Sequence, residues 1–197
     1  MNNDTELHSK LTFIDPRGDL TLLIGDEKHD TSKRFLVSSK VLTLASPVLA
    51  NLLSPKFKEG TMFHNGKCDT VTLEEDDLDT MGLILQILHY QSNKAPLKMA
   101  PTKLATLAIH CDKYDLIDAV KPWASQWCRL PDTSYTTVEW GYELLAASML
   151  RLPTFPLIAS NAAKQLKPNF SDEFQADERL ICLPDAMIGL FPILLLG

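Results

Sequence analysis

Two groups of side chains in this sequence are of the types that do chemistry, and the first is a run of carboxylates. Glu74, Glu75, Asp76 and Asp77 are consecutive. An acid–base pair requires carboxyl groups in a cleft with pKa values driven apart. The first turn of a helix favours the same residues without a cleft, because the positive end of the helix dipole attracts carboxylates. The run directly precedes an apolar segment, so we interpret it as a helix start.

The second group consists of histidines near cysteines, His110–Cys111 and His64 with Cys68. A zinc site requires about four ligands at close spacing, and neither C-x-x-C nor H-x-x-x-H occurs. We therefore expect no metal and no cofactor, and we expect Cys111 to be a small core residue. Fingerprints of a nucleophile elbow, a phosphate-binding loop or a dinucleotide site are also missing. These observations favour a protein that is not an enzyme.

The composition narrows the classes of partner and the cellular compartment that we expect. The chain has 197 residues, 45% hydrophobic and 22% charged, with a net charge of −6, which is typical of a globular protein. Nucleic acids and anionic membranes attract clustered cations, and no Lys/Arg cluster occurs, so we expect neither as a partner. The N-terminal sequence MNNDTELHSK lacks the apolar region of a secretory signal. Four scattered cysteines then predict free thiols in the cytoplasm and/or nucleus.

The N-terminal half predicts strands followed by a helical corner. Residues 19–24, DLTLLI, alternate as a strand does, and RFLVS is its hairpin partner; TVTL predicts a third short strand. Ser39 is expected to cap a first helix with Leu44 directed inward. Ser46 is expected to cap a second helix, with Pro47 at its first position. The following stretch, FKEGTMFHNGKCD, contains two glycines and is predicted to be a loop.

Helices dominate the remainder. Apolar spacing predicts helices over 74–91, 102–113 and 115–127, with Trp123 and Trp127 in the core, and a further pair within 139–166. The stretch 167–185 is polar and expected to be loosely structured. Strands first and helices afterwards define an α+β fold, a small sheet flanked by a cluster of short helices. The expected organisation is a flexible N-terminus (1–18), the α+β domain (19–130), a helical extension (131–178) and an apolar tail (179–197). The end of that tail, AMIGLFPILLLG, is shorter than the ~20 apolar residues that span a bilayer.

Five motifs, in order across residues 18–130, resemble the BTB/POZ domain in the short form common in fungal proteins. They are GDLTLLIG, FLVSSKVLTLASPVLANLL, VTLEEDDLDTMGLILQILHY, LATLAIHCDKYDL and VKPWASQWC. One such motif would be a weak signal, but five in register are strong. The family usually has a histidine before the basic residue of the corner, whereas Ser39 precedes Lys40 here.

The resemblance implies partner-binding residues. Phe57 and Glu59 stand where BTB adaptors of cullin-3-type ubiquitin ligases carry an apolar-x-Glu motif, in which the apolar side chain fills a pocket on the partner and the Glu fixes orientation. Tyr114 resembles a position that flanks the same surface. Asp19 and Lys40 resemble a charged pair that lines a pocket near the centre of the family's dimer.

Each of these residues also has a structural alternative. Phe57 can fold back onto its own core, and Tyr114 can close the core at a helix end. Asp19 and Lys40 can form a partly buried ion pair, or can simply end two elements, and isolated ion pairs are weak indicators of function.

The function expected from the resemblance is that of a non-enzymatic protein–protein interaction module, a substrate adaptor of a cullin-3-type ubiquitin ligase whose partners are a cullin and a substrate protein. The alternative is a self-associating structural or regulatory scaffold, a homo-oligomer unconnected to ubiquitination. A transcription-related regulator is a remote third hypothesis. Residues 131–197 carry no receptor domain that we recognise, so the sequence identifies no substrate.

Overall fold

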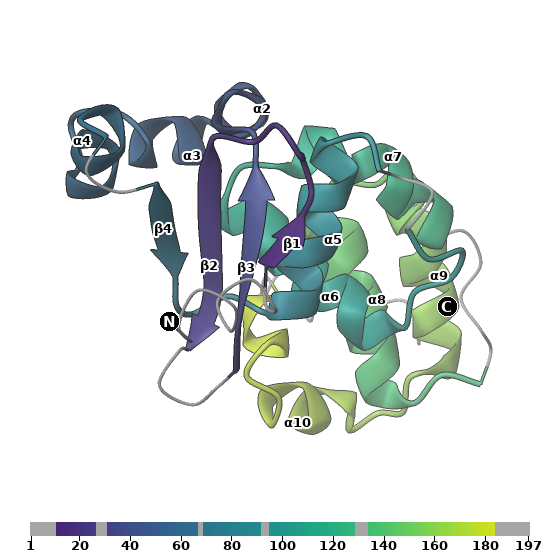
Figure 1. The fold of residues 1–197 in the computed structure, drawn as a ribbon. Coiled ribbons are helices and arrows are strands. Elements are labelled where there is room, and N and C mark those ends of the chain that lie inside the picture. The colour runs from purple at the N-terminus through teal and green to yellow at the C-terminus, as the bar shows by residue number, and fades with distance from the viewer. Residues whose placement is uncertain (1–10, 27–30, 67–68, 92–94, 129–133, 184–197) are drawn as a thin grey trace. The chain divides into compact units, whose positions relative to one another are not determined.

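The computed structural model describes residues 11–26, 31–66, 69–91, 95–128 and 134–183 (Figure 1). The chain divides into two compact units, which we call the sheet unit (residues 1–95 with 113–119) and the helical unit (residues 96–112 with 120–197). This division differs from the predicted domain boundary at residue 130, because residues 96–112 cluster with the C-terminal helices. The end of the apolar tail, residues 184–197, lies outside the described residues.

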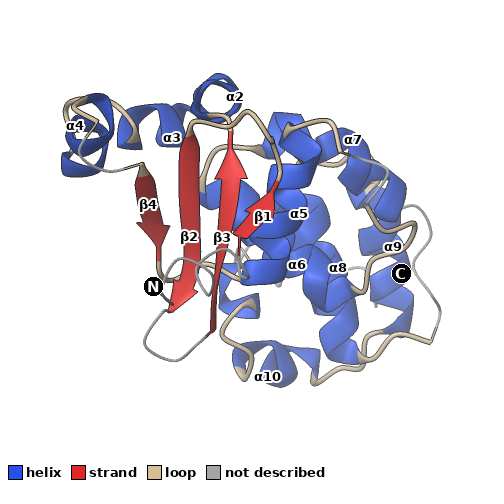
Figure 2. Cartoon of the chain, in the orientation of Figure 1, coloured by secondary structure: helices blue, strands red, loops and turns tan. Residues whose placement is uncertain are grey.

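The sheet unit contains four strands in the order β1-β3-β2-β4 (Figure 2). They are β1 (Leu11–Phe13), β2 (Leu20–Asp26), β3 (Thr31–Val37) and β4 (Thr70–Leu73). β2 and β3 pair antiparallel, whereas β1 pairs with β3, and β4 with β2, in parallel. The three predicted strands and the α+β class are confirmed. β1 is a difference: residues 1–18 were expected to be flexible, but residues 11–13 hydrogen-bond along β3.

One face of the sheet forms the core of this unit. Leu20, Leu22 and Ile24 of β2 alternate onto that face and are at most 1% exposed. Helix α5 (Leu78–Leu88) packs against β2 and β3. It begins at Leu78, four residues later than predicted, and of the acidic run Asp77 is its N-cap, accepting from Thr80 N at 2.8 Å. The alternation seen in the sequence therefore reports burial against a helix.

Three short helices follow β3: α2 (Ser39–Ala45), α3 (Pro47–Leu52) and α4 (Lys58–His64). Ser46 caps α3 ahead of Pro47 as predicted, but the cap of α2 is Ser38 and not Ser39. The predicted loop after α3 is wrong, since α4 occupies seven of its residues. Leu44 was expected to face inward, yet its side chain is 80% exposed.

The helical unit is built from residues that the sequence assigned mainly to helices. Its elements are α6 (Pro101–Lys113), α7 (Ile117–Trp127), α8 (Thr137–Met149), α9 (Phe155–Gln165), α10 (Phe170–Gln175) and a 3-10 helix, η3 (Leu180–Cys182); the end of α6 and the start of α7 belong to the sheet unit. The prediction of loose structure over 167–185 is wrong. A Cβ on Gly141 of α8 would approach Leu180 Cδ1 to 2.7 Å and Phe174 Cε1 to 2.8 Å, so this glycine lets α10 and η3 pack closely on α8. Trp123 and Trp127 are only half-buried, and Trp127 donates Nε1–H to Pro96 O at 2.8 Å.

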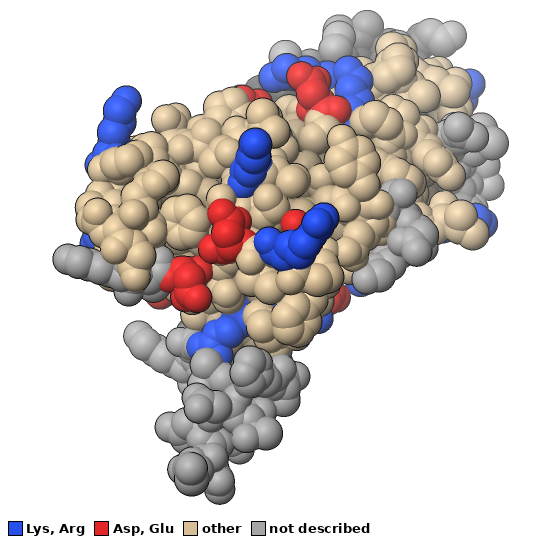
Figure 3. All heavy atoms as spheres, turned by 45° about the horizontal axis from the view of Figure 1, so that its top comes forward, with Lys and Arg blue, Asp and Glu red and all other residues tan. Residues whose placement is uncertain are grey.

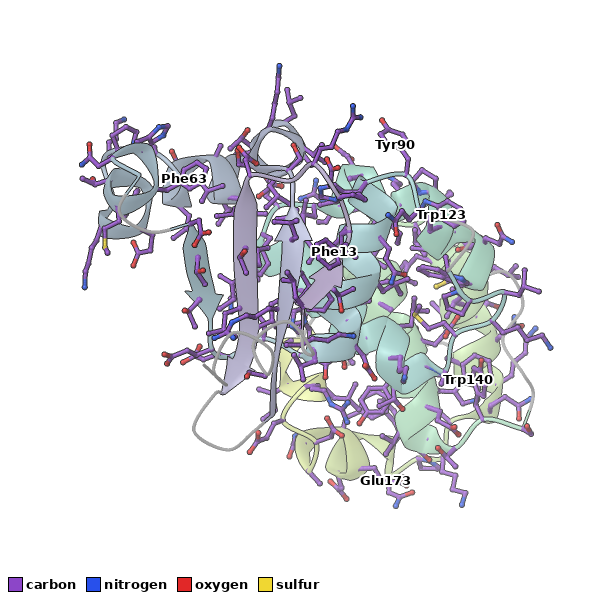
Figure 4. All side chains as sticks on the ribbon, viewed as in Figure 1. Phe13, Phe63, Tyr90, Trp123, Trp140 and Glu173 are labelled. Carbon is purple, nitrogen blue, oxygen red and sulfur yellow. The ribbon has the colours of Figure 1, made fainter. Side chains whose placement is uncertain are left out.

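Three consecutive residues after α5 fix its end to the rest of the sheet unit. His89 Nε2 accepts from Ser38 N at 3.1 Å, and the Gln91 side chain donates to Ile14 O. Between them, Tyr90 adopts a left-handed backbone with φ of 59° and is 92% exposed (Figure 4). Tyr90 N donates to Ile87 O and Gln91 N to Gln86 O, the bonding pattern of a Schellman C-cap.

Replacing Tyr90 with glycine should stabilise the sheet unit. A Cβ in the left-handed region costs about 1–2 kcal/mol, and glycine avoids that cost while losing about 0.5–1 kcal/mol through its freer unfolded chain. We expect Tyr90→Gly to raise the free energy of unfolding by a few tenths to about 1 kcal/mol in urea denaturation. Tyr90→Ala keeps the Cβ and should give no gain. Equal stabilisation by both variants would contradict this explanation.

Candidate functional site

Phe57 and Glu59 lie at the start of α4, immediately after the helical corner. Phe57 occupies the N-cap position in an extended conformation, with φ of −108° and ψ of 157°. Its side chain is 50% exposed, so it does not fold back fully onto its own core. Glu59 is exposed in the first turn of α4, where the helix dipole favours a carboxylate. Both side chains are therefore accessible to another molecule.

The backbone around Phe57 is held by contacts that the sequence gives little hint of. Thr61 Oγ1 lies 2.8 Å from both Pro55 O and Phe57 O, so these two carbonyls share its single proton. Gly60 is buried, and a Cβ placed there would meet Ser54 O at 2.0 Å and Leu53 C at 2.5 Å. Only glycine permits so close an approach of α4 to the end of α3. The half-exposed Phe57 thus projects from a tightly packed turn.

Asp19 and Lys40, both described by the structure, do not form the ion pair that was one alternative for them. Asp19 accepts from Ser39 N and from Ser39 Oγ, both at 2.7 Å. Partial burial of Asp19 works in the opposite direction, but the hydrogen bonds from Ser39 lower the pKa of its carboxyl. Lys40 is exposed beside this contact. Ser39, and not Lys40, therefore contacts the Asp19 carboxylate.

Tyr114 is interior and offers no surface for a partner. It is 4% exposed, and its hydroxyl donates to the Asp76 carboxylate, which also accepts from Lys113 Nζ at 2.8 Å. Burial, reinforced by the Asp76 carboxylate, raises the pKa of Tyr114. The Tyr114 carbonyl accepts from Ser46 Oγ, the cap of α3. The structural alternative for Tyr114, an aromatic residue that closes the core at a helix end, agrees with this position.

No hydrogen bond or ion pair joins any two of the five predicted site residues, all of which are described. The sequence analysis missed Leu44 on α2 and Val48 on α3, which are 80% and 40% exposed on the two helices preceding Phe57. An apolar residue outside the inward stripe of a short helix could have signalled this. Figure 3 looks onto the top of Figure 1, and its Lys, Arg, Asp and Glu side chains lie scattered over a mostly uncharged surface.

The buried thiols are poorly suited to nucleophilic chemistry, because the thiolate is the reactive form. Burial raises the pKa of Cys111 to about 12. Burial and the nearby Glu143 carboxyl also raise the pKa of Cys128. Cys111, Cys128 and Cys182 are free in the structure, while Cys68 lies outside the described residues. Within the described ranges, no group of three or more His, Cys, Asp or Glu side chains is placed to hold a metal ion.

Two polar clusters of the helical unit were not foreseen from the sequence. The hydroxyl of Tyr142 donates to Asp177 and accepts from Arg179, whose guanidinium lies 4.4 Å from the centre of the tyrosine ring. Glu143 is 3% exposed beside Cys128. Burial raises the pKa of Glu143 to about 7, although a hydrogen bond from the Cys128 thiol favours the ionised form.

No protein-family profile matches this chain, and no match is found among curated proteins. Among the helices that the structure describes, none combines the length and the apolar character needed to cross a bilayer.

Gly60→Ala tests whether the close packing of α4 sets the position of Phe57. The added methyl group would overlap the backbone of Ser54, and overpacking of this kind costs about 1–3 kcal/mol. We expect a loss of this size in the free energy of unfolding, measured by urea denaturation. Gly66→Ala is a useful contrast, because a Cβ at Gly66 meets no atom within 4 Å and only its positive φ opposes the change. Wild-type stability of Gly60→Ala would contradict the packing argument.

Glu143 should make stability depend on pH. Its folded-state pKa of about 7 lies above the ordinary value of 4.5, so the folded state binds the proton more tightly. Protonation of Glu143 therefore contributes about 3 kcal/mol to the free energy of unfolding. This contribution is fully present below pH 4.5 and is lost as the pH rises through 7. The difference in unfolding free energy between wild type and Glu143→Gln, measured in urea from pH 5 to 8, should therefore change by most of that amount in favour of the variant. A difference that stays constant over this range would contradict the assignment.

Proposed function

We propose that this chain is a non-enzymatic protein–protein interaction module, an adaptor that binds a cullin of the ubiquitin-ligase class through Phe57 and Glu59. The cullin assignment rests on the resemblance of the motifs to BTB domains. The observation that carries the interaction role is the half-exposed Phe57 side chain, which projects from a turn held by a Thr61 hydrogen bond and by the close packing of Gly60.

The physical argument follows from the cost of ordering an interface. A large apolar side chain that is already fixed in position loses little conformational entropy when a partner pocket covers it. Aromatic anchors of this kind dominate binding free energy, while a neighbouring charge at the rim adds orientation and specificity. Glu59 stands two residues after Phe57 on the exposed first turn of α4 and supplies such a charge. The exposed Leu44 and Val48 provide further apolar surface on α2 and α3.

Binding to the purified N-terminal domain of cullin-3, measured by calorimetry, tests this proposal. Phe57→Ala should weaken binding by roughly 2 kcal/mol or more, as expected for a buried aromatic anchor. Glu59→Ala should weaken it less, since a rim charge contributes mainly to specificity. Neither variant should lower the melting temperature appreciably, because both side chains are solvent-accessible in the free protein.

Phe13→Ala is the matched control. Phe13 is the same residue type and is 52% exposed, but it lies on β1 and not at the corner. Its removal should leave cullin binding unchanged. No binding by the wild-type chain at tens of micromolar would reject the cullin adaptor. Normal binding by both corner variants would reject the site. Light scattering on the same samples tests the self-associating scaffold, which requires a mass that rises with concentration.

A further inference from the structure

The outer edge of β4 is a feature of the sheet unit that the proposed function does not use. β4 is the last strand of the sheet, and no described strand pairs with its outer side (Figure 1). On the inner side, Thr21 N of β2 donates to Asp69 O at 2.7 Å, and Thr21 is in register with Thr70. Along a strand the backbone groups of successive residues turn alternately to opposite sides. Val71 and Leu73 therefore direct their N–H and C=O groups toward β2, and Thr72 directs its own away from the sheet.

The side chains of β4 suit a strand that can accept a neighbour. Val71 and Leu73 are 3% and 8% exposed and face the core, whereas Thr72 is exposed on the other face. All four residues of β4 are Thr, Val or Leu, and neither lysine nor proline stands within the strand. Protected edge strands commonly carry such residues to prevent pairing. In a peptide that is added here, every second side chain would lie on the core face beside Val71 and Leu73 and would be apolar. The side chains between them would lie on the exposed face beside Thr72 and would be polar.

The charges at the two ends of β4 indicate what kind of peptide fits. Exposed Asp69 immediately precedes the strand, and exposed Glu74 and Glu75 immediately follow it. An added strand would place its own ends beside these carboxylates, so basic ends are favoured and acidic ends are repelled. Antiparallel pairing with a second copy of β4 would bring Asp69 next to the partner's own acidic end. Like charges facing each other across a strand pair are destabilising, which argues against self-pairing.

We propose that the outer edge of β4 binds an extended segment of another protein as an additional strand, with basic residues at both ends of that segment. Main-chain hydrogen bonds to Thr72 supply the affinity, and the flanking carboxylates supply the choice of partner. This site is separate from Phe57 and Glu59, and either can exist without the other.

The test uses a fluorescein-labelled synthetic peptide, KKVTVTKK, and fluorescence anisotropy on the full chain. Thr72→Pro removes the outward N–H but no bond to β2, a change that edge strands tolerate. We expect this variant to bind the peptide roughly tenfold or more weakly, whereas Thr72→Ala, which keeps the N–H, should bind within about twofold of wild type. An equal loss of peptide affinity in Thr72→Pro and Thr72→Ala would overturn the proposal that the peptide hydrogen-bonds to the main chain of Thr72.

Three further comparisons separate strand addition from simple charge attraction. The peptide KKVPPTKK has the same charge but lacks an N–H on each side of its centre, so it cannot form a continuous strand ladder in either orientation, and it should bind far more weakly than KKVTVTKK. The peptide EEVTVTEE should not bind. The double substitution Glu74→Lys with Glu75→Lys should weaken binding of KKVTVTKK. Equal binding of the threonine and proline peptides would reduce the effect to electrostatics and overturn the proposal.

Amide hydrogen exchange on the wild-type chain gives a readout that does not depend on any variant folding. Saturating KKVTVTKK should slow exchange at Thr72 and leave α4, which carries Phe57, unchanged. Unchanged exchange at Thr72 in the peptide complex would overturn the proposal. Because the cullin experiment monitors Phe57 alone, failure at one site is distinguishable from failure at the other.

Discussion

The geometry of the sheet unit depends on one buried hydroxyl group, that of Ser46. Its Oγ accepts from Leu49 N at 2.9 Å and donates to the carbonyl of Tyr114. The Tyr114 hydroxyl in turn donates to Asp76, which Lys113 also contacts. Because a buried polar group without a partner costs about 1–3 kcal/mol, each member of this chain of bonds requires the next. The corner between α2 and α3, the turn before α5 and residues 113–114 are thereby fixed together, and five residues separate the end of α3 from the start of α4.

Local signals made the corner and the main helices predictable from the sequence. Ser46 and Pro47 are a cap and a first helical residue in any context, and the alternation of β2 depends only on which face is buried. α4, β1 and α10 escaped prediction because their stability is tertiary. Gly60 in α4 disfavours a helix locally and is explained only by the backbone of Ser54 lying against it. β1 is three residues long and exists through parallel pairing with β3, which no local pattern encodes.

At the candidate site, too, tertiary contacts decide what local sequence does not. Sequence position was sufficient to select Phe57 and Glu59, but their exposure depends on how α4 packs. Tyr114 shows the converse, since its type suits both an interface and a core, and only the carboxylate of Asp76 decides that it is interior. For Asp19, the alternative of an ion pair with Lys40 could not be decided from sequence, because the choice between two neighbouring residues depends on the geometry of the corner. Ser39, the residue before Lys40, donates to both carboxylate oxygens of Asp19, one bond coming from its backbone N–H and the other from its hydroxyl.

The two proposed surfaces of the sheet unit differ in charge. Exposed Lys56, Lys58 and Glu59 surround Phe57 with charges of both signs, whereas Asp69, Glu74 and Glu75 flank β4. Rim charges add little affinity but repel partners of the wrong sign, so a partner with an acidic rim is excluded from the second surface but not from the first. The anchors also differ, because an aromatic side chain requires a preformed pocket and an open strand edge requires an extended chain. A single unit with both surfaces could hold two different proteins at once, which is what a connecting protein requires and what a catalytic site does not.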